Sequence, residues 1–203
     1  IEKNNGKPGS TKYSLDHATG KWLIVLDSDD WLDKDEFLKT IDKLEKNDAD
    51  IIFCNYTYYM NDSGKYRARN PVGTKFEIAK KEKMPRYFWH FDNNVIHNIE
   101  FLRKNNFHYP ETVTAYEDIY NNMYALQFAK DIKMLNVNFY MYRVRQGGGN
   151  LSSNAVFINK LPQYIEMVKA VLKMDYSNKY TQSHMIWFAS LQIIAIMGMI
   201  DMR

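Results

Sequence analysis

Residues 21–33 read Lys-Trp-Leu-Ile-Val-Leu-Asp-Ser-Asp-Asp-Trp-Leu-Asp, an apolar run that ends in a cluster of carboxylates. The continuous apolar segment Trp22–Leu26 contains two β-branched residues, which is typical of a strand buried on both faces of a sheet. The acidic residues at positions 27–30 follow at its carboxyl end, the edge where open α/β sheets bind ligands. The stretch therefore predicts an α/β fold with an acidic site at that edge.

The spacing of the carboxylates favours a metal site. Asp27 and Asp29 are separated by one residue, so they can share a hard divalent cation, Mg²⁺ or Mn²⁺, that keeps its other positions for water and phosphate oxygens. Asp29 is the stronger candidate ligand. The alternative is that Asp29 or Asp30 only caps the following helix, since Asp is a favoured N-cap residue. Capping by Asp30 is also compatible with a metal site.

Length and composition limit the classes of protein to which the chain can belong. The chain has 203 residues, 45% of them hydrophobic, which is enough for one domain with a real core and a helical appendage. A net charge of +3 is too mild to indicate a nucleic-acid partner. Cys54 lies in an apolar run and is the single cysteine, so no disulfide framework is expected and a reducing compartment is the default. The apolar run Met185–Ile200 is interrupted by polar residues and falls short of a membrane span.

The segment Leu26–Leu32, Leu-Asp-Ser-Asp-Asp-Trp-Leu after an apolar strand, resembles the D-x-D signature of family 2 glycosyltransferases. The resemblance implies the GT-A fold, a mixed sheet flanked by helices, and an inverting transfer from a nucleotide-sugar, by resemblance a UDP-sugar. Asp27 and Asp29 would hold Mg²⁺ or Mn²⁺ on the donor diphosphate. The acceptor would be a glycan or lipid-linked glycan in capsule, lipopolysaccharide or other surface polysaccharide synthesis.

The beginning of the chain bears on how much of that fold is present. Ile1–Gly9 is polar and follows no strand, whereas in the family an initial βαβ portion that holds the nucleoside precedes the D-x-D strand. We therefore expect a piece of a longer protein that lacks this portion. Gly9–Gly20 predicts a short helix, opened by Ser10 or Thr11. It resembles the family helix whose basic residue faces the donor diphosphate; Lys12 is the matching position, or else an ordinary surface lysine.

The next segments alternate between helix and strand. Lys34–Lys46 has the spacing of an amphipathic helix, and the β-branched and aromatic segment Asp50–Met60 predicts a strand. A turn at 61–64 then sends the chain back. The strand before the acidic residues, this helix and the second strand form a βαβ unit, which places Asp27 and Asp29 at its mouth. Two further helices are expected, over Ile78–Trp89 and Asn98–Asn105.

A second acidic pair, Glu117-Asp118, precedes the predicted helix Ile119–Lys130. It resembles the Glu-Asp pair that family 2 enzymes place at the start of a helix on the acceptor side, where the position of Asp118 is the catalytic base. An inverting transfer needs one carboxylate to take the proton of the attacking hydroxyl. Glu117 would assist or bind acceptor. The alternative is that both residues only complement the helix dipole.

The last third contains a strand, a loop and helices. Asp131–Arg143 reads as one or two strands and leads into Tyr-x-Tyr-Arg-x-Arg, which resembles the family's donor-side loop; Arg143 or Arg145 would bind the diphosphate, or else pair with a surface carboxylate. We expect a partial catalytic domain over 1–153 and a helical extension over 154–203. The extension packs on the domain, or its apolar face contacts a membrane or a partner.

Two other functions compete with this hypothesis. A haloacid-dehalogenase-like phosphatase would use Asp27 as nucleophile and Asp29 as acid, but that family has Thr or Val near the position of Asp30-Trp31, and no later Gly-Asp-x-x-x-Asp is present. The other is an inactive, truncated binding fragment. For an active enzyme we expect a cytoplasmic location, with peripheral contact to the inner face of the membrane through the C-terminal helices.

Overall fold

The structure is a computed structural model that describes residues 6–69, 78–80, 94–107, 116–145, 160–174 and 186–190. In chain order the elements are α1 (Gly6–His17), β1 (Trp22–Leu23), β2 (Trp31–Leu32), α2 (Lys34–Glu45), β3 (Ile51–Met60), β4 (Lys65–Arg69), β5 (Ile78–Lys80), β6 (Val95–Asn98), α3 (Ile99–Lys104), α4 (Glu117–Phe128), β7 (Ile132–Val144) and α6 (Leu161–Leu172). Residues 186–190 are also helical. The predicted domain boundary after Ser153 lies outside the described residues.

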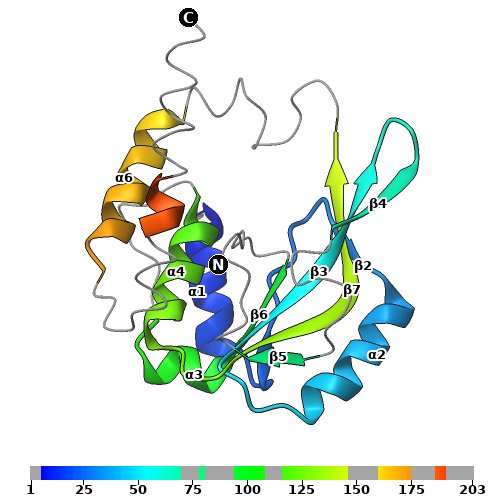
Figure 1. Ribbon diagram of the computed structural model, residues 1–203, viewed down its shortest axis with the longest axis horizontal. Helices are drawn as coiled ribbons and strands as arrows, with labels where there is room; N and C mark the ends of the chain where they lie inside the picture. The colour runs from blue at the N-terminus through cyan, green and yellow to red at the C-terminus, as the bar shows by residue number, and fades with distance from the viewer. Residues whose placement is uncertain are drawn as a thin grey trace, which may run out of the picture.

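A mixed sheet connects these elements. Its strands follow the order β1-β6-β3-β7-β2, with β4 paired to β3 and β5 paired to β7. β3 and β7 run parallel, from Ile51↔Ile132 to Met60↔Val144, whereas β6 is antiparallel to both β1 and β3. Figure 1 shows α2 on one side of the sheet and α4 with α6 on the other. The predicted α/β architecture, a mixed sheet flanked by helices, is therefore confirmed.

The stretch 21–33 reaches from one end of the strand order to the other, because β1 pairs with β6 and β2 pairs with β7. The expectation of a strand over Trp22–Leu26 that is buried on both faces is wrong. The strand ends at Leu23, its two residues are only half buried, and Leu26 is 46% exposed. An apolar run does not reveal how many strands will flank it, and among the described residues β1 has β6 as its partner.

The predicted βαβ unit is present in a modified form. β1 and β3 run in the same direction, but β6 lies between them because it pairs antiparallel with both. The acidic residues 27–30 still follow the carboxyl end of β1, as predicted.

α1 starts earlier than predicted, and α2 starts at the predicted Lys34 but with a different N-cap. α1 begins at Gly6, before the predicted Ser10 or Thr11, and the hydroxyls of these two residues donate to the carbonyls of Gly6 and Lys7, as in a helix interior. α2 is capped by Asp33, whose Oδ1 accepts from the Glu36 N–H at 3.0 Å. Neither Asp29 nor Asp30 is the cap, so that alternative is wrong.

The predictions for the middle of the chain are confirmed in part. The β3–β4 hairpin forms as predicted around Gly64, whose φ of +64° suits a residue without a side chain. α3 also forms, with Asn98 as its N-cap. Ile78–Lys80 is not helical: it is β5, paired antiparallel to β7, so tertiary pairing overrides the local helical pattern. The rest of that predicted helix lies outside the described residues.

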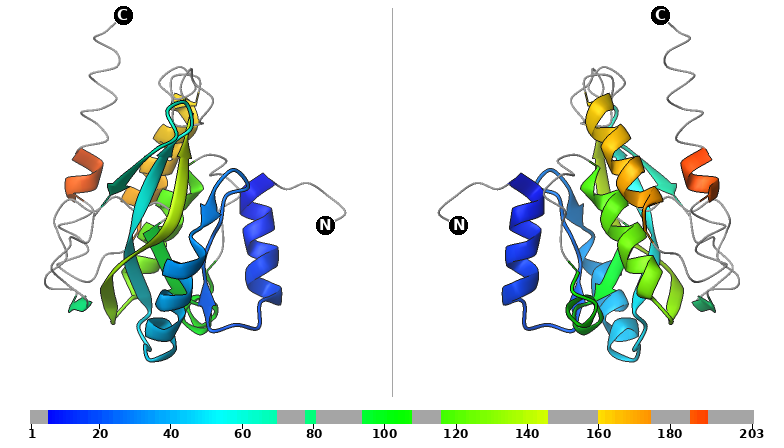
Figure 2. Two further views of the ribbon diagram at one scale, coloured as in Figure 1. Left: turned by 90° about the vertical axis from the view of Figure 1, so that its right-hand side faces the viewer. Right: turned by 90° about the vertical axis from the view of Figure 1, so that its left-hand side faces the viewer.

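Two apolar clusters lie against the sheet. One joins β3, β6 and β7 to α3, α4 and α6, and includes Met123, Met167 and Phe188. The other joins the sheet to α2 through Leu44 and contains the buried Cys54. α6 therefore packs on α4, as Figure 2 also shows.

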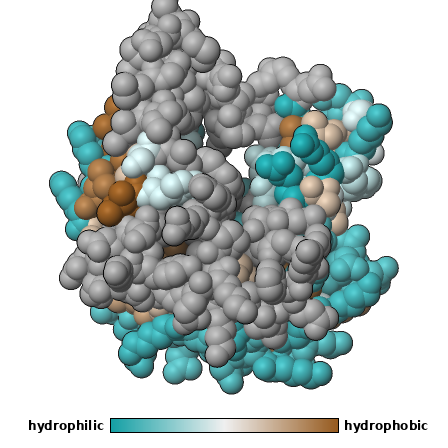
Figure 3. Space-filling view, viewed as in Figure 1, coloured by the Kyte–Doolittle hydropathy of each residue, from teal (hydrophilic) through white to brown (hydrophobic). Residues whose placement is uncertain are grey.

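The surface of α6 and the following helical segment leaves some apolar side chains exposed. Leu172 is 54% and Ile186 62% exposed, and Figure 3 shows hydrophobic surface on this side of the molecule and hydrophilic surface over α2. Among the described residues, no helix has the length and apolar character needed to cross a membrane.

Candidate active site

The acidic turn, residues 27–30, connects β1 to β2. The Asp30 N–H donates to the Asp27 carbonyl at 3.1 Å, which closes the turn. Because β2 pairs with β7 directly afterwards, the turn is held against the side of β7.

Asp30 anchors this turn. Its carboxylate accepts two hydrogen bonds from β7, from the Tyr140 hydroxyl and from the Arg143 N–H, both at 2.8 Å. Tyr140 in turn accepts from the Asp27 N–H at 3.2 Å. Burial raises the pKa of the Asp30 carboxyl, while the hydrogen bonds from Arg143 and Tyr140 act to lower it. Asp30 therefore positions its neighbours and has both oxygens occupied within the protein.

Asp29 lies between the two arginines predicted from the sequence. The Arg145 guanidinium contacts its carboxylate at 2.6 Å, and Nε of Arg143 donates to its carbonyl at 2.9 Å. The Arg143 guanidinium also lies 5.0 Å from the centre of the Trp31 ring. The side chains of Asp29 and Arg145 are 36% and 37% exposed, so both are open to a ligand from solvent.

The helix lysine at the site is Lys7. Its Nζ lies 2.9 Å from Asp27 Oδ1 and 3.8 Å from Glu117 Oε1. The predicted Lys12 instead pairs with Asp16 on the exposed side of α1 and is not brought to the acidic turn. Sequence reasoning missed Lys7 because it started the helix at Ser10 or Thr11. With the observed start at Gly6, Lys7 is the first-turn lysine.

Glu117 and Asp118 are the first two residues of α4, which begins two residues before the predicted Ile119. Tyr116 precedes them in the left-handed conformation, with φ of 61°, and turns the chain into the helix. Asp118 Oδ1 accepts from the Ile119 N–H at 2.9 Å. The structure is therefore compatible with both interpretations of the pair. Carboxylates at a helix start complement its dipole, and Lys7 also links Glu117 to Asp27.

The described residues contain no group of three His, Cys, Asp or Glu side chains placed to hold a metal ion. The predicted ligands Asp27 and Asp29 are a pair of oxygen donors, 40% and 36% exposed. That donor set suits Mg²⁺, which is usually held by one or two carboxylates together with substrate phosphates.

Sequence comparison places the N-terminal half of the chain, with Lys7, Asp27 and Asp29, in a family context. The profile of glycosyl transferase family 2 matches residues 1–107. The uncharacterized glycosyltransferase EpsJ of Bacillus subtilis (strain 168) is 25% identical over 149 residues, 70% of this chain and 43% of the relative. The poly(ribitol-phosphate) beta-N-acetylglucosaminyltransferase TarS of Staphylococcus aureus (strain Mu50 / ATCC 700699) is 24% identical over 161 residues, 75% of this chain and 26% of the relative.

Solved structures show the same fold. The crystal structure of S. aureus TarS 1–349 superposes with a TM-score of 0.68 at 16% identity, covering 93% of this chain and 52% of that one. Its complex with UDP-GlcNAc gives 0.68 at 17% identity, covering 91% and 52%. The chain thus spans about half of these structures. The family profile covers more than half of the chain, which therefore belongs to glycosyl transferase family 2.

Proposed function

We propose that this chain is part of an inverting glycosyltransferase that moves a sugar from a UDP-sugar to a hydroxyl of a surface glycan. The observation that carries the proposal is the position of Lys7, which joins Asp27 of the acidic turn to Glu117 of α4. Two carboxylate pairs that are far apart in the sequence therefore border one site. Family membership and the crystal structures of TarS in complex with UDP and UDP-GlcNAc support a nucleotide-sugar donor.

The acidic turn is the donor side of the proposed site. Asp27 and Asp29 would hold Mg²⁺ or Mn²⁺, which neutralises the charge that develops on the leaving diphosphate. Lys7, Arg143 and Arg145 already lie against the turn. Arginine suits a diphosphate because its planar fork binds pairs of oxygens.

The start of α4 is the acceptor side. Asp118 is the proposed base, which takes the proton of the acceptor hydroxyl as its oxygen attacks the anomeric carbon. Glu117 assists or binds the acceptor. The N-terminal position on a twelve-residue helix keeps both residues at one end of α4, where Glu117 lies next to Lys7.

The phosphatase alternative loses support. It belongs to a different enzyme family, whereas the family profile that matches this chain is that of a glycosyltransferase. The inactive binding fragment is kept as the second candidate because the chain spans 43% of EpsJ and 52% of TarS 1–349. The cytoplasmic location, with membrane contact through exposed residues such as Leu172 and Ile186, belongs to the proposal for the active enzyme.

Calorimetric titration of UDP and UDP-GlcNAc, with and without Mn²⁺, tests the donor side. We expect metal-dependent binding that Asp29→Ala abolishes and Asp42→Ala leaves intact, since Asp42 is exposed on α2. Donor binding whose affinity changes neither with Mn²⁺ nor with Asp29→Ala would contradict the proposed metal site. Binding without turnover of any glycan acceptor would favour the binding fragment.

A further inference from the structure

Three cations of β4 lie on one face of the β3–β4 hairpin. Lys65, Arg67 and Arg69 alternate with Tyr66 and Ala68, and side chains along a strand point to alternate faces. All residues of β4 are exposed, and Figure 3 shows hydrophilic surface over the hairpin. Neighbouring cations are two residues apart, about 6.7 Å, so the row extends over about 13 Å.

Tyrosines of the adjacent strands share this face. Arg67 is directly opposite Tyr58 of β3, and Tyr58 is opposite Tyr142 of β7. The rings of Tyr58 and Tyr142 are 5.5 Å apart, and the Arg69 guanidinium lies 5.3 Å from the Tyr58 ring centre. We call the surface formed by Lys65, Arg67, Arg69, Tyr58 and Tyr142 the basic tyrosine face.

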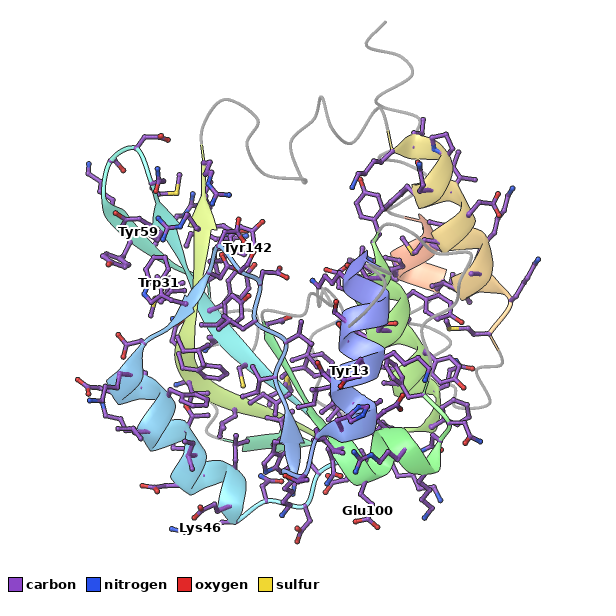
Figure 4. All side chains as sticks on the ribbon, turned by 180° about the vertical axis from the view of Figure 1, so that it is seen from behind. Tyr13, Trp31, Lys46, Tyr59, Glu100 and Tyr142 are labelled. Carbon is purple, nitrogen blue, oxygen red and sulfur yellow. The ribbon has the colours of Figure 1, made fainter. Side chains whose placement is uncertain are left out.

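The basic tyrosine face continues into the proposed active site. One row further along the strands, Arg69 is opposite Tyr56, and Tyr56 is opposite Tyr140. Tyr140 is the residue whose hydroxyl contacts both Asp27 and Asp30. Figure 4 shows Trp31 and Tyr59 on the other side of the strands from Tyr142. By register the cations share the face of Tyr140, which contacts the acidic turn.

The charge on this face is not balanced within the described residues, where Lys65, Arg67 and Arg69 form no ion pair with a carboxylate. By contrast, Lys21, Lys39 and Lys133 each pair with an acidic residue. Charged side chains on an edge strand also prevent pairing with other sheets. That purpose does not require tyrosines beside the cations or a continuous path to a catalytic site.

We propose that the basic tyrosine face binds the acceptor, and that the acceptor is a glycan with negative charges along its length. This inference rests on the proposed glycosyltransferase function and names the class of its acceptor. A row of cations about 13 Å long fits repeated charges on a chain better than the adjacent phosphates of one diphosphate. Sugar rings can lie on the apolar faces of Tyr58 and Tyr142, while phosphate or carboxylate groups meet Lys65, Arg67 and Arg69.

The test compares two triple variants with equal loss of charge. K65Q/R67Q/R69Q removes the cations of β4, and K34Q/K39Q/K46Q removes three exposed lysines of α2 and its C-cap. Figure 4 shows Lys46 at the end of the molecule away from the hairpin. Thermal unfolding confirms that each variant folds, and UDP binding provides a separate measure of the donor side.

The probes are an oligo(glycerol phosphate), an oligogalacturonate and a neutral dextran oligomer of equal length. We expect at least one anionic oligomer to bind more tightly than dextran, with an affinity that falls as salt rises. The β4 variant should lose roughly tenfold or more of that affinity, and the α2 variant less than about twofold. The preferred anionic oligomer shows whether phosphate or carboxylate is recognised.

Three results would overturn the inference: equal losses in the two triple variants, equal binding of dextran, or no binding of either anionic oligomer. Tighter binding to phosphatidylglycerol vesicles than to the oligomers would also overturn it, in favour of a membrane surface. If UDP and UDP-GlcNAc fail to bind while an anionic oligomer binds through β4, the proposed donor site fails and the glycan-binding face stands.

Discussion

The acidic turn and the start of α4 each present a pair of carboxylates, but they are anchored differently. The turn is held by polar contacts with Tyr140 and Arg143 of β7 and with Arg145, which follows the strand. α4 is held by burial: its apolar side chains pack in the large cluster, and Asn122 lies beside the buried His97 of β6. Hydrogen bonds orient the residues of the turn one by one, whereas the packed helix holds its two carboxylates in place as one rigid unit. Substitutions in the two regions should therefore fail in different ways.

The largest effect is expected at α4. Asp118→Asn should lower kcat by roughly 10²–10⁴, because the amide cannot accept the acceptor's proton, and should leave UDP-sugar affinity unchanged. Glu100→Gln is the matched control, an exposed first-turn carboxylate of α3 that Figure 4 shows away from the site. Radiolabelled sugar transfer measures the first quantity and calorimetry the second. A loss of donor affinity equal to the loss of kcat would remove Asp118 from the acceptor side.

Acidification should weaken the anchor of α4. Burial lowers the pKa of His97 to about 4, while the Asn122 side chain opposes this shift. Between pH 6.5 and 4 the unfolded chain binds a proton that the folded chain does not, so the free energy of unfolding falls as pH falls through this range. For His97 alone the difference amounts to about 3 kcal/mol or less.

Urea unfolding at a series of pH values measures this dependence. His97→Gln should flatten the slope between pH 6.5 and 4, and His17→Gln, at an exposed position of α1, should retain it. Identical slopes in the wild type and His97→Gln would show that the buried imidazole does not contribute.

A smaller effect on stability is expected at the anchor of the acidic turn. Tyr140→Phe removes the hydroxyl that donates to Asp30 and accepts from the Asp27 N–H. Leaving partly buried polar groups without a partner costs about 1–3 kcal/mol of unfolding free energy. Tyr66→Phe, at a residue 62% exposed, should change stability by less than about 0.5 kcal/mol. Equal effects of the two substitutions in thermal unfolding would contradict the anchoring function of Tyr140.

The smallest effect separates the two lysines of α1. Lys7→Gln should weaken UDP-sugar binding about tenfold, because the donor side of the proposed site loses the positive charge next to Asp27. Lys12→Gln should change this binding less than about twofold, because Lys12 pairs with Asp16 away from the site. Calorimetry with Mn²⁺ present measures both variants. A larger effect at Lys12 would restore the position inferred from the sequence and contradict the assignment of Lys7 to the donor side.

Much of the architecture could be predicted because its signals are local. The β3–β4 hairpin follows from a turn-forming segment between two strand-forming segments, and α2, α3 and α4 follow from local helical patterns. The order of the strands could not be predicted this way. β1 and β2 lie in one thirteen-residue stretch, yet they pair with β6 and β7, which come much later in the chain.

The candidate site could likewise be predicted only where its signals are local. Asp27, Asp29, Glu117 and Asp118 could be selected from the sequence because each pair follows or opens a recognisable element, although their catalytic and metal-binding assignments stay predictions. Lys7 was missed because the start of a helix is poorly defined by residues that can serve either as caps or in the interior, as Ser10 and Thr11 do here. The contact of Asp30 with Tyr140 joins residues 110 positions apart, which no local pattern reveals.

By itself the sequence determined the family, the types of most elements and the two acidic pairs, because hydrophobic period, turn residues and short motifs act over a few residues. Only the tertiary structure decided which side chains each carboxylate contacts. Asp30 became an anchor and Asp27 and Glu117 became neighbours through Lys7 because strand pairing and helix packing brought distant segments together. The burial and hydrogen bonding that distinguish otherwise identical aspartates arise from those long-range contacts.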